Sequence, residues 1–207
     1  MEILLIRHGE NKANITREFS CKHVDYPLTA KGKVQAQQTA AALANMQIDK
    51  VVSSPLLRAK QTAETICQRM KSTFEVAEEL REIDVGVLEL RPPTDSARRY
   101  FFEIINEWNR GNLDKRFAGG ESGAELRDRF YSVIKKYIEL PIERLVIVGH
   151  AGIFLNGIAH LCELDKDIEF YANSHPNCSI SKVEVFQHLG HYCFELKEWC
   201  NVSHLID

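Results

Sequence analysis

Short runs of apolar residues alternate along the chain with longer segments in which apolar positions recur every three or four residues. The short runs cover residues 2–6, 50–53 and 144–148, and a weaker run covers 74–77. Brief apolar runs followed by glycine, serine or proline are typical of buried β-strands. We therefore expect four strands before residue 150.

The segments between these strands show helical spacing. Helices are expected over residues 30–46, after Ser54 and Pro55, after Thr94, over 122–139 and over 152–162. Thr29 is the expected N-cap of the first helix, Ser54 and Pro55 are the N-cap and first-turn residue of the second, and Ser122 with Glu125 forms a capping box. One face of the helix after Thr94 is interpreted as core and consists of Ala97, Phe101, Ile105 and Trp108.

The last part of the chain has a different pattern. Residues 179–186 and 191–199 predict two strands joined by a turn at Gly190. Strands that alternate with helices indicate an α/β fold, here a three-layer α/β/α sandwich with a mostly parallel central sheet. The 207 residues contain no repeat or linker and favour one domain over residues 1–207, with residues 90–122 as a short inserted helical cap.

Composition excludes several classes of protein. With 44% hydrophobic and 27% charged residues, the chain has the composition of a globular protein. A net charge of -3 leaves no global positive field for nucleic acid or an anionic membrane. The first apolar run is too short for a secretion signal, and no segment has the length of a membrane-spanning helix. Six scattered cysteines are expected to be reduced, which predicts a cytoplasmic protein.

Arginine and histidine residues follow three of the predicted strands. The tetrapeptide Arg7-His8-Gly9-Glu10 follows the first strand, Arg58 lies in the first helical turn after residues 50–53, and Gly149-His150-Ala151-Gly152 follows residues 144–148. Open α/β sheets bind ligands beyond the carboxyl ends of their strands. We therefore expect these side chains to meet in one pocket.

Such a pocket is suited to a phosphate group. Guanidinium groups form paired charge-assisted hydrogen bonds with phosphate oxygens, and amides at the helix start after His150 add further donors. A histidine with a pKa near 6.5 is largely neutral at pH 7 and acts as a nucleophile without a metal. These residues together predict phosphoryl transfer to an imidazole nitrogen.

The same residues resemble the histidine phosphatase superfamily, also called phosphoglycerate-mutase-like, whose hallmark is Arg-His-Gly just after the first strand. Further motifs in the order of the family are Asn14, Pro27-Leu28-Thr29 with Gly32 and Gln35-Ala36, residues 53–63, Leu80-Arg81-Glu82 with Gly86 and Glu89, Gly120-Glu121-Ser122, and the segment around His150. The end of the chain is most similar to small bacterial phosphatases often labelled probable phosphoglycerate mutases.

The resemblance implies a role for each site residue. His8 attacks phosphorus and becomes the phosphohistidine, and the phosphoryl oxygens are held by Arg7, Asn14, Arg58 and His150. Glu82 protonates the leaving oxygen and then activates water, a task suited to a pKa raised by burial. Without the resemblance, three other carboxylates are alternatives for this role: Glu79, Asp84 and Glu89.

Residues near the expected pocket mouth bear on the choice of substrate. Ala151, Cys21 and Lys22 are expected to contact it. Three positions depart from the pattern of the family: Asn11, Cys21 and Leu90. The basic residues Lys22, His23, Arg91, Arg98 and Arg99 would favour a substrate with a second anionic group, and a solvated face is the alternative interpretation.

The predicted function is that of a phosphatase for small phosphate monoesters. Phosphoglycerate mutases of this superfamily carry a longer insertion before the capped helix, so the short segment 90–122 favours the phosphatase. A phosphoglycerate mutase is the first alternative, and a non-catalytic protein that binds a phosphorylated ligand is the second. A dinucleotide-dependent dehydrogenase is disfavoured because no Gly-x-Gly-x-x-Gly follows the first strand.

The expected partner is a small phosphorylated metabolite, without nucleic acid or membrane, and monomer and homodimer both remain open. No cofactor and no metal are expected, since histidine, arginine and glutamate suffice for the chemistry. His188, His191 and Cys193 lie close together, but without a closed ligand set they are interpreted as strand residues.

Overall fold

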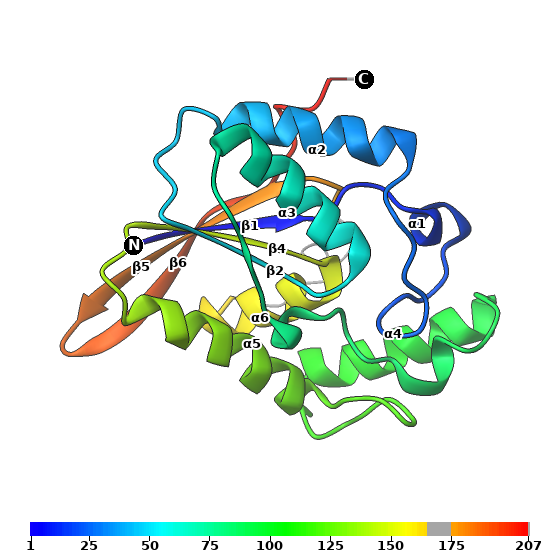
Figure 1. Ribbon diagram of the computed structural model, residues 1–207. Helices are drawn as coiled ribbons and strands as arrows, with labels where there is room; N and C mark the ends of the chain where they lie inside the picture. Colours follow the sequence, from blue (N-terminus) through cyan, green and yellow to red (C-terminus); the bar gives the residue numbers. More distant parts are fainter. Residues whose placement is uncertain (165–174, 207) are drawn as a thin grey trace.

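The computed structural model describes residues 1–164 and 175–206. A six-stranded sheet in the order β3-β2-β4-β1-β5-β6 lies at its centre (Figure 1). The strands are β1 (Glu2–Arg7), β2 (Lys50–Ser53), β3 (Glu75–Val76), β4 (Arg144–Gly149), β5 (Ile180–His188) and β6 (His191–Asn201). Strands β1 to β4 pair in parallel, whereas β5 runs antiparallel to β1 and to β6. The expected α/β fold is confirmed, with a mixed sheet whose antiparallel part is the predicted C-terminal hairpin.

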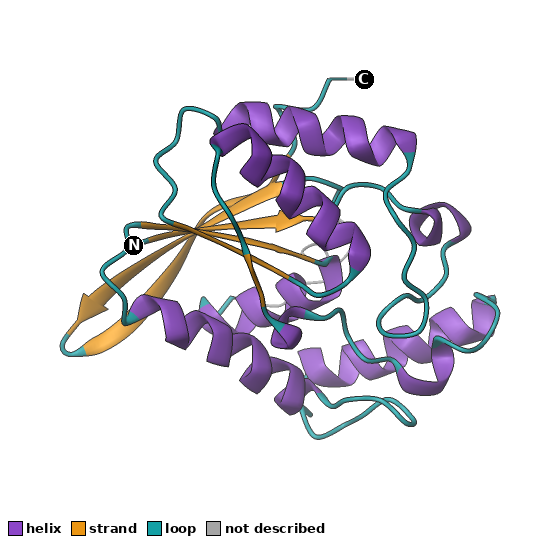
Figure 2. Ribbon diagram, in the orientation of Figure 1, coloured by secondary structure: helices purple, strands orange, loops and turns teal. Residues whose placement is uncertain are grey.

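Helices cover both faces of the sheet (Figures 1 and 2). They are α1 (Lys12–Thr16), α2 (Ala30–Leu43), α3 (Leu57–Met70), α4 (Asp95–Asn109), α5 (Gly123–Ile138) and α6 (Ala151–Leu161), with 3-10 turns at Glu78–Leu80 and Gly86–Leu88. Helices α2 and α3 pack together on one face, and α5 and α6 pack together on the other. This is the expected three-layer arrangement.

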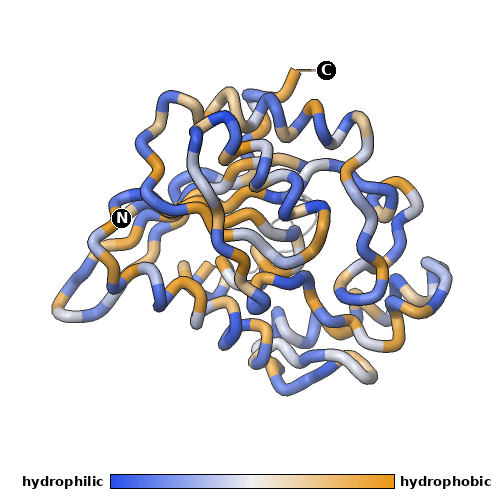
Figure 3. The backbone as a smooth tube through the Cα atoms, viewed as in Figure 1, coloured by the Kyte–Doolittle hydropathy of each residue, from blue (hydrophilic) through white to orange (hydrophobic). Residues whose placement is uncertain are grey.

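In the central strands, alternate side chains belong to two different hydrophobic cores, one on each face of the sheet. In β1, Ile3 and Leu5 belong to the cluster under α4, α5 and α6, whereas Leu4 and Ile6 belong to the cluster under α2 and α3. Because successive strand residues point to opposite faces, a strand covered on both sides needs an unbroken apolar run. Figure 3 shows these hydrophobic strands at the centre of the molecule.

Side-chain caps start most of the helices where the sequence predicts them. The Thr29 and Thr94 hydroxyls accept hydrogen bonds from the first turns of α2 and α4, and Ser122 with Glu125 forms the predicted capping box of α5. The prediction for Ser54 and Pro55 is wrong, because α3 begins only at Leu57.

The first amide of α3 is instead satisfied from a distant segment. Both carboxylate oxygens of Asp25 lie 2.9 Å from the backbone nitrogen of Leu57. A side chain distant in sequence replaces the local cap. The Ser54 hydroxyl accepts a hydrogen bond from the Leu56 backbone nitrogen at 3.3 Å and also makes a contact in the site.

Segment 90–122 contains α4 and the turn at Gly119 and Gly120. Ile104, Ile105 and Trp108 of α4 are buried, as is Ala97. Phe101 is only partly buried, and its ring packs against Phe19 and Phe117 with centroid distances of 5.3 and 5.6 Å. Among the four α4 residues that are interpreted as core from the sequence, only Phe101 lines the cavity that is described below. Among the described residues, none of the helices is long and apolar enough to cross a bilayer.

Candidate active site

The register of the sheet brings three strand ends together. Arg7 at the end of β1 pairs with Gly149 at the end of β4, and Ser53 at the end of β2 pairs with Val148. The next residues along the three strands are His8, His150 and Ser54. The ring centroids of the two histidines are 5.1 Å apart. The expectation of one pocket at this edge of the sheet agrees with this geometry.

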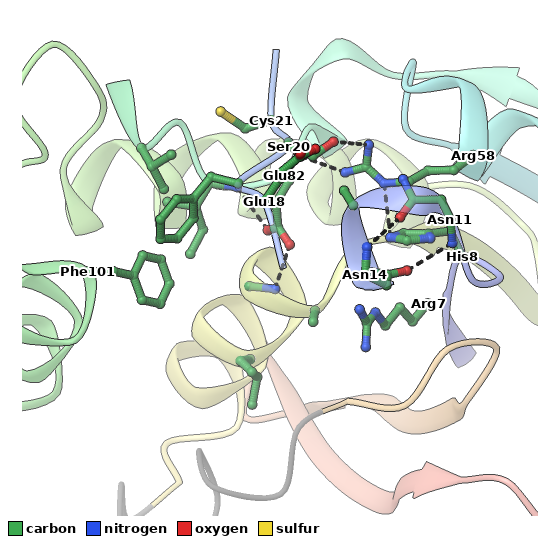
Figure 4. Close-up of a pocket in the computed structure, with 17 residues that line it drawn as sticks. Arg7, His8, Asn11, Asn14, Glu18, Ser20, Cys21, Arg58, Glu82 and Phe101 are labelled. Carbon is green, nitrogen blue, oxygen red and sulfur yellow. Dashed lines mark hydrogen bonds between the residues drawn. The ribbon is translucent and has the colours of Figure 1, made fainter. Parts of the chain in front are cut away.

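A cavity of about 250 Å³ opens beside His8 (Figure 4). Its walls consist of Arg7, His8, Asn11, Ala13, Asn14, Glu18, Phe19, Ser20, Cys21, Arg58, Glu82, Ile83, Val85, Phe101, Ala151, Gly152 and Leu155. Most of the sequence-predicted site residues are in this set. His150 lies behind the wall and is fully buried, and the Lys22 side chain is exposed and does not line the cavity.

The His8 side chain is buried and neutral, with a defined tautomer. Only 3% of the residue is exposed, and burial together with the charges of Arg58 and Arg7 lowers its pKa well below the ordinary value. Nδ1 lies 2.7 Å from the Gly9 carbonyl oxygen and must carry the proton, because that oxygen only accepts. The lone pair is therefore on Nε2, which accepts a hydrogen bond from Arg58 Nε at 3.0 Å.

Gly9 allows the chain to leave the strand beside His8. A Cβ atom at Gly9 would lie 2.5 Å from the carbonyl oxygen of Gly32 in the first turn of α2. The Gly9 amide donates to the hydroxyl of Thr62 on α3 at 3.1 Å. The backbone after β1 is thus held between two helices, which fixes the direction of the His8 side chain.

Arg58, in the first turn of α3, is held at all three nitrogens. Besides its bond to His8, it donates to the Ser20 hydroxyl at 2.9 Å and to the Ser20 carbonyl oxygen at 2.7 Å. Asp25 adds a charge contact at 3.7 Å. Burial lowers the pKa of Arg58 from its usual high value, while nearby carboxylates oppose the shift. The sequence did not single out Ser20, because a serine in a loop carries no motif.

The guanidinium group of Arg7 has one nitrogen with a hydrogen-bond partner and one buried nitrogen without. Nη1 donates to the carbonyl oxygen of His175, whereas Nε is buried and has no hydrogen-bond partner in the described structure. Burial lowers the pKa of Arg7 to about 10, so the guanidinium is still charged at neutral pH. His175 itself is buried, and its Nδ1 lies 2.6 Å from the Ser179 hydroxyl. The backbone carbonyl of His175 thus anchors Arg7 from the far side, and no motif in the sequence marks His175 for this contact.

His150 is fully buried between Ser54 and His8. Its Nε2 lies 2.7 Å from the Ser54 hydroxyl, and its Nδ1 has no partner among the described residues. Burial and the charge of Arg58 lower the pKa of His150 well below the ordinary value. Ser54, expected as a helix cap, thus orients the second histidine.

Three asparagines form a network beside His8. Asn11 is the N-cap of α1, and the side chains of Asn11 and Asn14 form a reciprocal capping box. Asn177 donates from Nδ2 to the His8 carbonyl oxygen and to Asn14 Oδ1, both at 3.0 Å. Asn11 is fully buried, and its Nδ2 has no partner in the described part of the chain. Neither helix α1 nor the contacts of Asn177 were predicted from the sequence. A helix of five residues is too short to show apolar periodicity, and a single asparagine has no spacing pattern.

Glu82 lies at the N-terminus of α6. Its two carboxylate oxygens accept hydrogen bonds from the backbone nitrogens of Gly152 at 3.0 Å and Ile153 at 2.9 Å, and Oε1 also accepts from Ile83 at 2.9 Å. A Cβ atom at Gly152 would lie 2.6 Å from Glu82 Oε1, so glycine is needed for this close approach. In this structure the carboxyl group receives hydrogen bonds and donates none.

Among the four carboxylates considered for the acid, only Glu82 lines the cavity. Asp84 caps the turn at Gly86 with a contact of 3.0 Å, and Glu79 is exposed. Glu18 also lines the cavity, although it belongs to no motif in the sequence.

Glu89 holds the loop that contains Cys21. Its buried Oε1 accepts hydrogen bonds from four successive backbone nitrogens, at 2.6 to 3.1 Å, from Cys21 to Val24. Burial would raise the pKa of Glu89, but the four amide donors together keep it below its usual value. The loop lies between Ser20 and Asp25, which both contact Arg58.

The remaining sequence candidates lie away from the cavity. His188, His191 and Cys193 lie at the tip of the β5–β6 hairpin, and the described residues contain no group of three or more potential metal ligands. The other basic residues considered at the mouth do not line the cavity: His23, Arg91, Arg98 and Arg99. His204, in the C-terminal segment after β6, does not line the cavity either, and its Nε2 lies 3.1 Å from both the Thr39 hydroxyl and the Cys178 carbonyl oxygen.

A neutral histidine beside two guanidinium groups defines a phosphoryl-transfer type of site, and comparison with known proteins identifies the family. The sequence matches the histidine phosphatase superfamily (branch 1) over residues 3–201. The probable phosphoglycerate mutase GpmB of Salmonella choleraesuis is 34% identical over 193 residues, covering 89% of this chain and 85% of the relative. The chain belongs to the histidine phosphatase superfamily, which confirms the resemblance seen in the sequence and the expected class of enzyme.

Solved structures have the same fold. The mycobacterial glucosyl-3-phosphoglycerate phosphatase in complex with VO3 superposes with a TM-score of 0.79 at 22% identity and covers 96% of this chain and 98% of its own. The α-ribazole phosphatase from Shigella flexneri gives a TM-score of 0.74 at 24% identity, with 97% and 96% covered. At these identities the comparison establishes the architecture.

Proposed function

We propose that this protein hydrolyses small phosphate monoesters through a phosphohistidine on His8. One observation carries the proposal: buried nitrogens without partners surround a neutral imidazole. Arg7 Nε, Asn11 Nδ2 and His150 Nδ1 have no hydrogen-bond partner among the described residues. Buried donors are almost always satisfied in folded proteins, so a ligand rich in acceptor oxygens fits this set.

In the first step, His8 Nε2 attacks phosphorus and the bond to the ester oxygen breaks. The Nδ1–H bond to the Gly9 carbonyl oxygen supports the positive charge that develops on the ring. Arg58 Nε, which occupies the lone pair in the free protein, turns to a phosphoryl oxygen. Arg7, Asn14 and His150 contact the other oxygens as negative charge shifts toward the leaving group.

Glu82 is the proposed proton carrier of both steps. As the carboxylic acid it protonates the departing oxygen, and as the carboxylate it then takes a proton from the water that attacks the phosphohistidine. Inorganic phosphate leaves and neutral His8 is restored. The backbone nitrogens of Gly152 and Ile153 donate to the carboxyl group and hold it against the cavity wall.

We further propose one domain over residues 1–207 in which segment 90–122 caps the cavity. Phe101 supports this role because it lines the cavity from α4. Ala151 and Cys21 also line it and are the proposed substrate contacts. Lys22 does not line the cavity, and its backbone amide donates to Glu89. The proposal includes a cytoplasmic location and a metal-independent reaction, and six free thiols support a reducing compartment.

Turnover of phenyl phosphate tests the proposal. We expect release of inorganic phosphate that His8→Ala abolishes and that a chelator leaves unchanged. His191→Ala, on the exposed hairpin, is the control and should retain full activity. Binding of phosphate without turnover in the intact protein would instead identify a non-catalytic binding protein.

A phosphoglycerate mutase is the second candidate, because the relative GpmB carries that name. The two reactions differ in their acceptor, which is water for the phosphatase and the phosphoglycerate itself for the mutase. Incubation with 3-phosphoglycerate separates them by product. Formation of 2-phosphoglycerate faster than inorganic phosphate would favour the mutase.

A further inference from the structure

The two ends of the cavity differ in chemistry. Figure 4 shows Arg7, His8, Asn14 and Arg58 together at one end and Phe101 at the other. The large apolar side chains that line the cavity form an apolar wall and are Phe19, Ile83, Val85, Phe101 and Leu155. Within this wall, the Phe19 ring packs against that of Phe101. The group that leaves with the ester oxygen faces this apolar wall once phosphorus lies at His8.

Two carboxylates line the cavity, Glu82 and Glu18, and only Glu18 has no part in the proposed reaction. Glu18 follows α1 and directly precedes Phe19, whose ring lies 5.3 Å from that of Phe101. Glu18 lines the cavity, and its Oε2 is buried without a hydrogen-bond partner among the described residues. An unpaired buried carboxylate oxygen is unfavourable, so a donor or a cation from a ligand would be stabilised there.

No basic side chain of the described wall balances Glu18. The only arginines or lysines that line the cavity are Arg7 and Arg58, and their nitrogens contact His175, His8 and Ser20. The five basic residues considered at the mouth do not line it. A second anionic group on the substrate would therefore face a carboxylate and aromatic rings, whereas a cation is attracted by both.

We propose that the physiological leaving group is apolar or aromatic and carries an amine or another positively charged nitrogen that binds Glu18. This inference rests on the proposed phosphatase function and specifies its substrate class. It excludes substrates with a second anionic group, including phosphoglycerates, as the preferred ones.

Three esters of similar size test the inference. They are 4-(aminomethyl)phenyl, 4-ethylphenyl and 4-(carboxymethyl)phenyl phosphate, which differ in the charge at one end and little in the phenol that leaves. We expect kcat/KM to fall in that order. A charge-assisted hydrogen bond corresponds to roughly 10- to 100-fold between the aminomethyl and ethyl esters.

The Glu18→Gln variant assigns the preference to this side chain. We expect the aminomethyl-to-ethyl ratio to fall at least about fivefold, with little change for the ethyl ester. The melting temperature should not fall, since an unpaired carboxylate is removed. Glu64→Gln, an exposed glutamate on α3, is the matched control and should leave the ratio unchanged.

Binding to the His8→Ala variant separates this inference from the proposed function. Dissociation constants of the three esters do not depend on turnover and should follow the same order. If no turnover depends on His8, the proposed phosphatase function is wrong, but the assignment of Glu18 is not affected. Equal or tighter binding of the carboxymethyl ester, or a preference that survives Glu18→Gln, overturns the assignment of Glu18.

Discussion

His8 meets two requirements of a nucleophilic imidazole at the level of single atoms. The ring is neutral because burial and two arginines oppose its protonation, and the Gly9 carbonyl oxygen directs the lone pair to Nε2. Arg58 has two functions, since its charge lowers the pKa of His8 and its Nε covers the lone pair until a phosphate arrives. Burial and the charge of Arg58 thus favour the neutral ring of the proposed nucleophile, and Arg58 is also a proposed phosphate ligand.

Removal of the Arg58 charge should change both properties. In Arg58→Gln, the pKa values of His8 and His150 are expected to rise, without reaching ordinary values because burial remains. Loss of the donor should lower kcat/KM at least about 100-fold. Histidine NMR titration and kinetics measure the two effects. Arg69→Gln, an exposed arginine of the same helix, is the control; unchanged histidine pKa values would refute the electrostatic role.

At the scale of elements, the site depends on loops that other segments hold in place. Glu89 binds the loop from Cys21 to Val24, and the residues on either side of that loop, Ser20 and Asp25, contact Arg58. The carboxylate therefore acts on the phosphate site through two intervening contacts. Its oxygen does not line the cavity, so Glu89 is a positioning residue.

Glu89→Gln should weaken both the loop and the site. The amide keeps an acceptor oxygen but loses the charge, so we expect a free energy of unfolding lower by about 1–3 kcal/mol. A misplaced Arg58 should lower kcat/KM roughly tenfold. Chemical denaturation and kinetics check both effects, with the exposed Glu79→Gln as control. If Glu89→Gln kept wild-type stability and activity, the negative charge of Glu89 would not be needed to hold the four backbone amides.

The pattern of apolar residues predicted most of the strands and helices, because it reflects which side chains are buried on the two faces of the sheet. Residues such as Thr29 and Ser122 mark helix starts through local contacts, and the structure confirms both caps. The start of α3 was missed because its cap, Asp25, lies far away in sequence. Glu18 was missed for the same kind of reason: only the folded cavity shows that its carboxylate lacks a partner.

At the scale of the whole molecule, three buried histidines link the site to stability. His8, His150 and His175 are 3%, 0% and 0% exposed. Burial lowers the pKa of His175 to about 3, and the pKa values of the other two are well below the ordinary value of 6.5. Below pH 6.5 the unfolded chain binds protons that the folded chain does not. Stability therefore falls as the pH falls through this range.

The pH dependence of unfolding should reflect all three side chains. Between pH 6 and 5, each is expected to reduce the free energy of unfolding by about 1.4 kcal/mol per pH unit, or roughly 4 kcal/mol per unit together. In His175→Gln the slope should be smaller by about 1.4 kcal/mol per pH unit, whereas the exposed His191→Gln is the control and should leave the slope unchanged. Denaturant titrations at several pH values measure the slope. A flat profile between pH 6 and 5 would mean that these histidines titrate normally in the folded protein.

Trapping the covalent intermediate tests the central claim most directly. The protein is mixed with a radiolabelled phosphate ester, quenched during turnover and digested, and the labelled peptide is sequenced. We predict one label, on His8, that is lost in acid and stable in base, and that is absent from His8→Ala. A label on serine, cysteine or a carboxylate, or turnover that persists in His8→Ala, would contradict the account.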